Sequence, residues 1–402
     1  MTWVVLENES PSILQKIEEI ATTLFNNELT NHTGLMWGKT GVALFFFYYS
    51  RFTQQEKYHQ HAVQLMDQVF DEIGMIENNS HTISEGLAGI GWAIEHLAKN
   101  KFDDIPTDEV LEDVDHFLAQ ALELEIREKN YSYLHGYLGL GWYFINRLPG
   151  KGAEDCLVRI VEALAAQGVP GKAGGISWQS QPGEDRGIPR YDLSLAQGIS
   201  AVVVFLSKLY QLDICKEKVT GLLSGAVTYI LQQSLDIAVY KSNFPRWVNE
   251  SVPSRMEWAF GDPGIGIALW QAARRTDNPG WEKEALRILL HSAARKDFRE
   301  ENVFASGLFN GAAGLSLLYN RMYHYTGNET FKETAKHWLE LTMGLGFKPG
   351  GLAGYKVWRN INDHQSWIND AGLLEGISGI GLTLLSTIST IEPRWDECLL
   401  LS

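Results

Sequence analysis

Two kinds of apolar pattern alternate along the 402 residues of the chain. In the first kind apolar residues recur every three or four positions, as at Ile13, Ile17, Ile20 and Leu24, which predicts a helix with one buried face. Six further stretches share this pattern, at about 63–73, 110–121, 153–168, 214–234, 281–295 and 329–343. In the second kind, such as 202–209, apolar residues cover most of the helix circumference, which predicts a helix buried on all sides.

Each helix of the second kind follows a short glycine phrase, in which a glycine and two further residues usually precede a second glycine. The first glycines of the seven phrases are Gly38, Gly86, Gly136, Gly198, Gly261, Gly311 and Gly376. They lie 48 to 65 residues apart, and a repeat at this period is the signature of a repetitive architecture. The alternation therefore predicts an all-α fold, an α/α toroid of seven inner and seven outer helices that forms one domain over residues 1–402.

Local residues refine where these helices begin. Pro11 suits the first turn of a helix, and Thr107 is expected as an N-cap. Asp262 is likewise expected as an N-cap, followed by Pro263 in the first turn. The windows 238–248 and 344–358 lack helical periodicity and are expected to be loops with short strands at most.

In such a toroid the inner helices all begin at one end, where unpaired backbone N–H groups and partial positive charge gather. The residue before each first glycine is expected to point toward the central cavity at that end. These residues are Trp37, Glu85, His135, Gln197, Phe260, Asn310 and Glu375. A site for a ligand is therefore predicted among them.

Charge and composition narrow the range of partners. Lys and Arg number 34 against 49 Asp and Glu, so the net charge is 34 − 49 = −15, and clustered basic residues that could bind phosphates are absent from the sequence. No apolar run reaches the length of a membrane span, and the first residues do not resemble a signal peptide. Cys156, Cys215 and Cys398 are too scattered for a disulfide framework. We therefore expect a cytoplasmic protein without a nucleic-acid partner and without membrane insertion.

Two long polar segments, 172–192 and 348–372, carry aromatic and Arg residues that are typical anchors for a peptide or a sugar. Trp178, Arg186 and Trp358 are the candidates that we take from them as substrate-binding residues, together with Glu85, Phe260, Asn310 and Glu375. The alternative is that both segments only close the end of the barrel.

The glycine phrases, above all Trp-Ala-Phe-Gly-Asp-Pro-Gly-Ile-Gly at 258–266 and Leu-Glu-Gly-Ile-Ser-Gly-Ile-Gly at 374–381, resemble the lanthionine synthetase C-like family. The resemblance extends over about 35–385 and implies an α/α barrel with seven inner and seven outer helices. Active members are zinc enzymes that close thioether rings in lanthipeptide precursors. In them a zinc-bound Cys thiolate of the peptide adds to a dehydroalanine or dehydrobutyrine residue.

The resemblance also locates the residues of that chemistry, and here the chain departs from the family. The three zinc ligands, two Cys and one His, correspond to Ala259, Phe309 and Asn310, none of which is a good zinc ligand. The proposed acid/base His corresponds to Gln197, whereas a matching Arg is retained at Arg255. We expect no metal and no other cofactor at this position. A relocated metal site at His135, Glu85 and Glu375 is the open alternative.

Three functions follow from these observations. The first is a zinc-free, cyclase-like pseudoenzyme that binds a precursor peptide, a dehydratase or another maturation enzyme. The second is a peptide-modifying enzyme that closes thioether rings without a metal, with Arg255, Gln197 and His135 as candidate catalytic residues. The third is carbohydrate chemistry, for which Glu85 and Glu375 would have to serve as a carboxylate pair.

Overall fold

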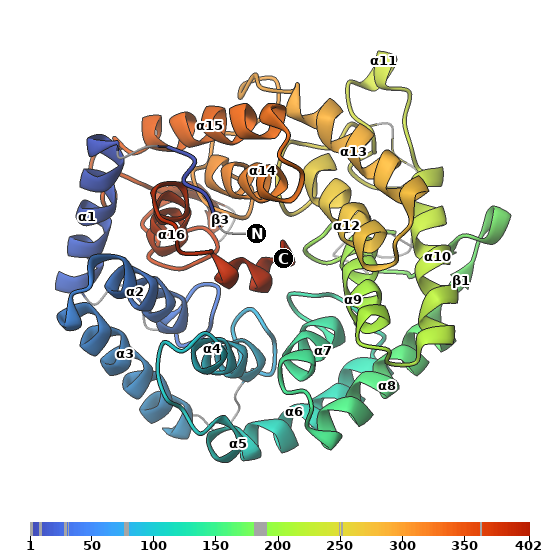
Figure 1. Cartoon of the computed structure of the whole chain (residues 1–402), viewed down its shortest axis with the longest axis horizontal. Coiled ribbons are helices and arrows are strands. Elements are labelled where there is room, and N and C mark those ends of the chain that lie inside the picture. Colours follow the sequence, from blue (N-terminus) through green and yellow to red (C-terminus); the bar gives the residue numbers. More distant parts are fainter. Residues whose placement is uncertain are drawn as a thin grey trace. The chain divides into compact units, whose positions relative to one another are not determined.

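The computed structural model shows a mostly helical chain (Figure 1). The chain packs as two compact units. It describes residues 3–7, 10–27, 30, 32–75, 80–180, 191–248, 250, 252–361 and 364–402. The first unit consists of Met1–Ser80, Ser84–Ala93 and Ala293–Glu397. The second consists of His81–Ile83, Ile94–Ser292 and Cys398–Ser402. The expectation of a single domain stays a prediction.

Seven helices of the described residues begin directly after the first glycine of a phrase. They are α2 (Lys39–Thr53), α4 (Leu87–Lys99), α7 (Tyr137–Asn146), α9 (Ile199–Gln211), α12 (Asp262–Arg275), α14 (Ala312–Thr326) and α16 (Ile377–Ile388). All residues of α7 and α16 are buried, so the prediction of helices buried on every side is confirmed. Residues of α4 belong to both units.

Seven further helices have one buried face, as the three-to-four periodicity predicts. They are α1 (Pro11–Asn26), α3 (Glu56–Met75), α6 (Glu112–Arg127), α8 (Lys151–Gln167), α10 (Lys216–Gln232), α13 (Pro279–Ala293) and α15 (Glu329–Gly344). In α1, for example, Ile13, Ile17, Ile20 and Leu24 are buried between exposed polar residues. Pro11 is the first residue of this helix, as expected.

Within each unit the two kinds of helix pack against each other. In the first unit α2 packs on α3, α14 packs on α15, and α16 contacts α1, α2 and α14. In the second unit α7 packs on α8, and α9 lies between α10 and α12. In the pairs α2 and α3, α7 and α8, α9 and α10, and α14 and α15, a helix that follows a glycine phrase packs on the next helix along the chain, which has one buried face. The two kinds of helix thus alternate along the chain as the two sequence patterns do.

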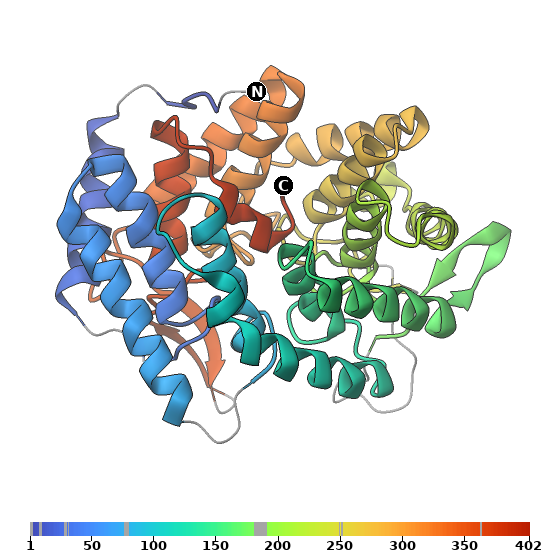
Figure 2. The ribbon, with the colours of Figure 1, turned by 60° about the horizontal axis from the view of Figure 1, so that its bottom comes forward.

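The remaining elements are short. They are α5 (Thr107–Val110), α11 (Ile237–Tyr240), β1 (Val169–Pro170), β2 (Ile176–Ser177), β3 (Val357–Ile361), β4 (His364–Ile368), and the 3₁₀ helices η1 (Lys172–Gly174) and η2 (Arg394–Leu399). Strands β1 and β2 form one antiparallel pair, and β3 and β4 form another. Figure 2 shows both pairs as arrows, in green and in orange. The window 238–248 differs from the expected loop because it begins with the single helical turn α11.

The prediction of Thr107 as an N-cap is wrong. Thr107 is the first helical residue of α5, and the N-cap is Pro106, whose side chain makes no capping hydrogen bond. The Thr107 hydroxyl therefore lies one position too far along the chain to cap the first turn. The single turn of α5 then ends at Leu111, and α6 begins at the next residue.

The prediction for Asp262 is also wrong, because this residue is inside α12 and the N-cap is Gly261. The Asp262 carboxylate is fully buried and accepts hydrogen bonds from the backbone N–H groups of Asn243 (2.7 Å) and Phe244 (3.1 Å). The Ser254 hydroxyl donates to it at 2.7 Å. Asp262 therefore fixes the long loop between α11 and α12 onto the first turn of α12.

The glycine phrase has a steric cause in the segment before each inner helix. A Cβ atom on Gly136 would lie 2.1 Å from the Asn130 carbonyl oxygen, and one on Gly139 would lie 2.3 Å from the Tyr133 oxygen. Both carbonyls belong to residues six positions upstream, because this segment folds back over the first helical turn. A side chain at either glycine would displace the backbone.

We call these segments the start loops, each a run of seven residues that ends at the first glycine. They are 32–38, 80–86, 130–136, 192–198, 255–261, 305–311 and 370–376. Six of them are closed by the same backbone hydrogen bond, from the first residue of the helix to the carbonyl seven positions upstream, such as Tyr137 N–H to Asn130 O at 2.9 Å. The sequence repeat is thus a repeat of one local structure.

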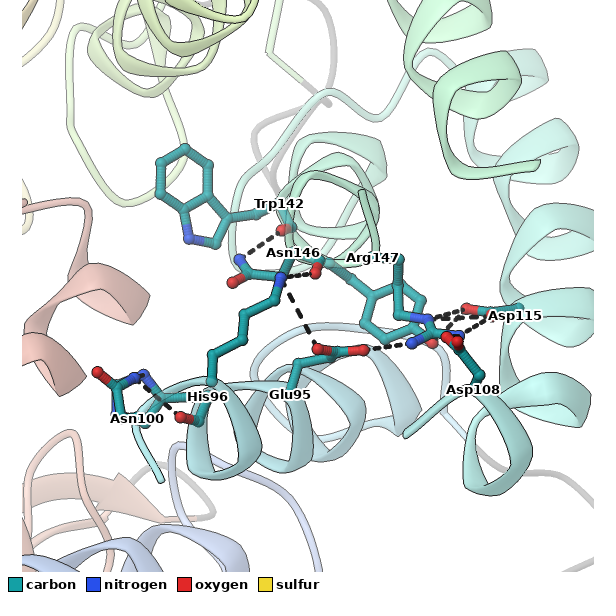
Figure 3. Close-up of polar contacts among 10 residues, drawn as sticks. Glu95, His96, Asn100, Asp108, Asp115, Trp142, Asn146 and Arg147 are labelled. Atoms are coloured by element: carbon teal, nitrogen blue, oxygen red, sulfur yellow. Dashed lines mark hydrogen bonds and ion pairs between the residues drawn. The ribbon is translucent and has the colours of Figure 1, made fainter. Parts of the chain in front are cut away.

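A charged network joins residues of α4, α6 and α7 within the second unit, as Figure 3 shows. Arg147 at the end of α7 donates to both carboxylate oxygens of Asp115 on α6, with Nε to Oδ1 at 3.0 Å. It also pairs with Glu95 on α4. The side chains of Arg147 and Glu95 are only 8% and 5% exposed, so this is a largely buried ion pair.

Candidate functional site

The residue before each first glycine is at least partly exposed in all seven start loops. Glu85 and His135 are exposed, whereas their neighbours Ser84 and Leu134 are buried. The other five such residues are half-buried: Trp37, Gln197, Phe260, Asn310 and Glu375. All seven residues are therefore at least partly accessible to a ligand.

Backbone hydrogen bonds join the start loops of the first unit in a row. Met36 N–H donates to Ser84 O at 2.9 Å, and Leu374 N–H donates to Met36 O at 2.8 Å. Leu308 N–H in turn donates to Leu374 O at 2.8 Å. The row therefore places four of the predicted residues on successive loops of this unit. Each comes one or two positions after the hydrogen-bonded residue of its loop; they are Glu85, Trp37, Glu375 and Asn310.

The second unit has a shorter row of the same kind. Leu134 N–H donates to Ala196 O at 3.2 Å, and Leu195 N–H donates to Ala259 O at 3.0 Å. His135, Gln197 and Phe260 therefore lie on three successive loops of this unit. The seven predicted residues divide into four in the first unit and three in the second.

Glu375 is part of a polar cluster in the first unit. The Trp37 indole N–H donates to Glu375 Oε2 at 3.2 Å, and Arg359 Nε donates to the same oxygen at 2.9 Å. Arg359 also pairs with Asp370 at 2.6 Å, at the beginning of the same start loop. The Glu375 carboxylate is thus engaged in a charge-assisted pair, and it anchors strand β3 to the start loop of α16.

The other predicted residues have different surroundings. Arg255 is exposed in the start loop of α12, and Trp358 on β3 is 45% exposed. Trp178, in contrast, is only 1% exposed, and its indole N–H donates to Leu164 O of α8 at 2.9 Å. It is therefore a core residue that fixes β2 to α8, and it offers no surface to a ligand. Arg186 lies outside the described residues.

The positions of the family's zinc ligands do not fit a zinc ion. Ala259 is fully buried and carries only a methyl group. Phe309 and Asn310 are half-buried, and between them they provide a single neutral amide. Zinc sites in proteins use thiolate, imidazole or carboxylate donors, and none of the three side chains is one of these.

The alternative metal site also lacks support in the described part of the chain. Glu85 and Glu375 belong to the first unit, and His135 belongs to the second. Among the described residues no three His, Cys, Asp or Glu side chains lie close enough to hold a metal ion together. The expectation that the chain uses no cofactor stays a prediction.

One residue of this region was not found by sequence reasoning. Glu257 lies in the start loop of α12, two residues before Ala259, and is only 7% exposed. Burial raises the pKa of its carboxyl group to about 7, although the charges of Arg255 and Arg246 act in the opposite direction. A carboxyl group with a pKa near neutrality can hold or release a proton under working conditions. In the sequence Glu257 is visible only as an acidic residue within a start loop, and this does not predict that its side chain is buried.

Comparison with known proteins places the chain in a family. The model of the lanthionine synthetase C-like protein family matches residues 11–400, so the chain belongs to this family. Nisin cyclase is a similar solved structure, with 17% sequence identity, 98% of each chain covered and a TM-score of 0.78. This likeness shows the fold, and it confirms the predicted all-α class of α/α toroids. The chain is thus lanthipeptide cyclase-like.

Other matches are more distant. A sugar epimerase from a ruminal bacterium has 10% identity and a TM-score of 0.45, over 94% of this chain and 98% of that one. The cellobiose 2-epimerase of Bacillus thermoamylovorans has 11% identity and the same TM-score, over 94% and 97%. Neither bears on function. A comparison with curated protein sequences finds no match. In the described part of the chain no helix is both long and apolar enough to cross a membrane.

Proposed function

We propose that this protein is a zinc-independent, cyclase-like protein of ribosomal peptide maturation, which binds a precursor peptide without the zinc-thiolate chemistry of its family. One observation carries the proposal: Ala259, Phe309 and Asn310 stand at the three zinc-ligand positions of a chain that otherwise matches the family from residue 11 to residue 400. A fold retained over that length while every metal donor is replaced favours retention of binding over retention of the metal reaction.

The accessible residues of the start loops support a peptide ligand. Trp37 and Phe260 present partly exposed aromatic rings, which are typical anchors for peptide side chains. Gln197 and Asn310 add amide groups that can both donate and accept hydrogen bonds to a peptide backbone. The expected partners are a precursor peptide and, as the chain would act in the cytoplasm, the dehydratase or another enzyme that processes it.

A synthetic peptide with one dehydroalanine and one Cys, and without acidic residues, tests this function. We expect it to bind the chelator-treated protein as well as the zinc-supplemented protein, with the binding measured by fluorescence anisotropy. Phe260→Ala should weaken binding about tenfold, because it removes an aromatic anchor. Binding that needs zinc, or no binding at all, would contradict the proposal.

A metal-free enzyme is the second candidate, and Glu257 favours it. Ring closure forms a C–S bond between the Cys sulfur and the β-carbon of dehydroalanine, and the thiol proton ends on the α-carbon. A carboxyl group with a pKa of about 7 could accept that proton from the thiol and return it to the α-carbon. Arg255 in the same loop could stabilise the enolate oxygen that forms in between.

Loss of free thiol distinguishes the two candidates, because ring closure removes the Cys thiol without changing the peptide mass. Alkylation with N-ethylmaleimide followed by mass spectrometry counts the thiols that remain. A metal-free enzyme would consume the thiol faster than buffer does, and Glu257→Gln would remove this acceleration and its dependence on pH. If the thiol is lost no faster with the protein than in buffer alone, the protein binds the peptide without catalysing ring closure.

A further inference from the structure

The β3–β4 hairpin has two different faces. Its register pairs Val357 with Ile368, Trp358 with Trp367 and Arg359 with Ser366. Because successive side chains of a strand point to opposite faces, Val357 and Arg359 share one face and the two Trp residues share the other. Val357 is only 7% exposed, and Arg359 is paired with Glu375 and Asp370. The face with the Trp residues therefore points away from the body of the unit.

Exposed aromatic rings and a Lys side chain lie on or next to that outer face. The Trp358 and Trp367 rings are 5.1 Å apart between centroids, and they are 45% and 41% exposed. Lys348 Nζ lies 2.9 Å from the centroid of the Trp367 ring, in a cation–π contact. Phe347, next to Lys348, is 77% exposed. We call these four residues, Phe347, Lys348, Trp358 and Trp367, the tryptophan surface.

The charge of this surface is unbalanced. In the described part of the chain, no carboxylate forms an ion pair with Lys348 or with the nearby Lys356. Burial and then the Lys356 ammonium group lower the pKa of Lys348 to about 8. On the other face, Asp370 and Glu375 are paired with Arg359. Glu19 is paired with Lys16, whose Nζ lies 5.3 Å from the centroid of the Phe347 ring. A local excess of positive charge thus lies beside exposed aromatic rings, on a chain whose net charge is −15.

We propose that the tryptophan surface is a docking site for an acidic peptide segment that carries aromatic or apolar side chains. Carboxylates of the segment would pair with Lys348 and Lys356, and its apolar side chains would pack on Trp358, Trp367 and Phe347. The inference rests on the proposed function, since it assigns the segment to the precursor peptide. A flat anionic membrane is the weaker occupant, because it would bring its charge close to the whole acidic chain.

The position of the surface suits this role. Arg359 follows Trp358 on the same strand, and it holds the strand to the start loop of α16 through Asp370 and Glu375. A peptide bound on the tryptophan surface is therefore tethered next to the start loops of the first unit. Such tethering raises the local concentration of the following residues of the peptide there, without further contacts.

The test uses the full chain and a fluorescein-labelled peptide of alternating Asp and Phe, which contains neither Cys nor dehydroalanine. We expect Trp367→Ala and Lys348→Glu each to weaken its binding by about tenfold or more. Phe304→Ala is the matched control, since Phe304 is 48% exposed in the same unit and lies outside the tryptophan surface; it should change binding less than about twofold. Circular dichroism checks that each variant is folded.

Three results would overturn the inference: equal binding by all the proteins, equal binding of a peptide with Lys in place of Asp, or binding to phosphatidylglycerol vesicles without binding to the peptide. The outcome is separable from that of the proposed function. The dehydroalanine and Cys peptide without acidic residues should bind Trp367→Ala as well as the unchanged protein. Normal binding of that peptide beside a negative result for the acidic one therefore rejects the docking site alone.

Discussion

Arg147 gives the sharpest prediction about stability in the second unit. Its guanidinium group pairs with Glu95 and Asp115, and its side chain is 8% exposed. Burial lowers the pKa of Arg147, but the hydrogen bonds to Asp115 and Glu95 outweigh this and raise the pKa above its ordinary value. We expect Arg147→Met, which keeps most of the stem of the side chain, to leave the buried Glu95 carboxylate with only the more distant ion pair to Lys99.

The magnitude follows from the burial of the two acids. Removal of one member of a buried ion pair costs about 3–5 kcal/mol, chiefly because the remaining charge stays in the interior. Glu95 is 5% exposed and bears this penalty, whereas Asp115, at 31% exposure, can recover hydration. Because Lys99 still pairs with Glu95 at 3.7 Å, we place the loss near the lower limit, at about 3 kcal/mol.

Urea unfolding followed by circular dichroism measures this loss as the change in the free energy of unfolding. Arg159→Met is the matched control: Arg159 on α8 pairs with Glu123 on α6 at the surface, with 40% and 54% exposure, and should cost less than about 1 kcal/mol. Equal losses in both variants would refute the reasoning.

Three further predictions concern a start loop and the first turns of the helices that follow such loops. Burial raises the pKa of Glu257 to about 7, so the contribution of this residue to stability is complete below pH 4.5 and is lost as the pH rises to 7. Glu257→Gln should therefore be more stable than the unchanged protein by up to about 3 kcal/mol at pH 8, and by little at pH 4.5. Urea titrations at both pH values measure the difference. Gly139→Ala should lower the free energy of unfolding by about 1–3 kcal/mol in the same assay, since its Cβ would lie 2.3 Å from Tyr133 O. Gly152→Ala is the control, because this glycine has open space around it, and this variant should not destabilise the protein. Asp262→Ala should cost about 3 kcal/mol or more, because at least three buried donors lose their acceptor; a loss below about 1 kcal/mol would show that the loop does not depend on them.

The fold was largely predictable because its signals are local and repeated. The periodicity of residues such as Ile13, Ile17 and Ile20 reports one buried face, and the glycine phrase reports a backbone contact six residues upstream. Each signal needs only the neighbouring residues to be interpreted. The repeat of both signals along the chain then defines the number and order of the helices.

The surroundings of single polar and aromatic residues were less predictable, because they depend on distant segments. Asp262 was expected to cap its own helix, but it instead binds the backbone of a loop about twenty residues upstream. Trp178 was expected at a ligand site, but it directly follows the two-residue strand β2 and is buried in the core, where its indole N–H donates to Leu164 O. The partner of Glu375 is Arg359 of β3, and sequence reasoning did not pair them. Such pairings follow from tertiary packing, which no local pattern encodes.

The central claim, that this family member works without zinc, is tested most directly by the zinc content of the purified protein. The protein is purified without chelators, incubated with zinc, separated from free metal by gel filtration and measured by elemental analysis. Because Ala259, Phe309 and Asn310 provide no thiolate or imidazole, we predict a zinc content far below one per chain. A stoichiometric zinc ion that survives gel filtration would contradict the account.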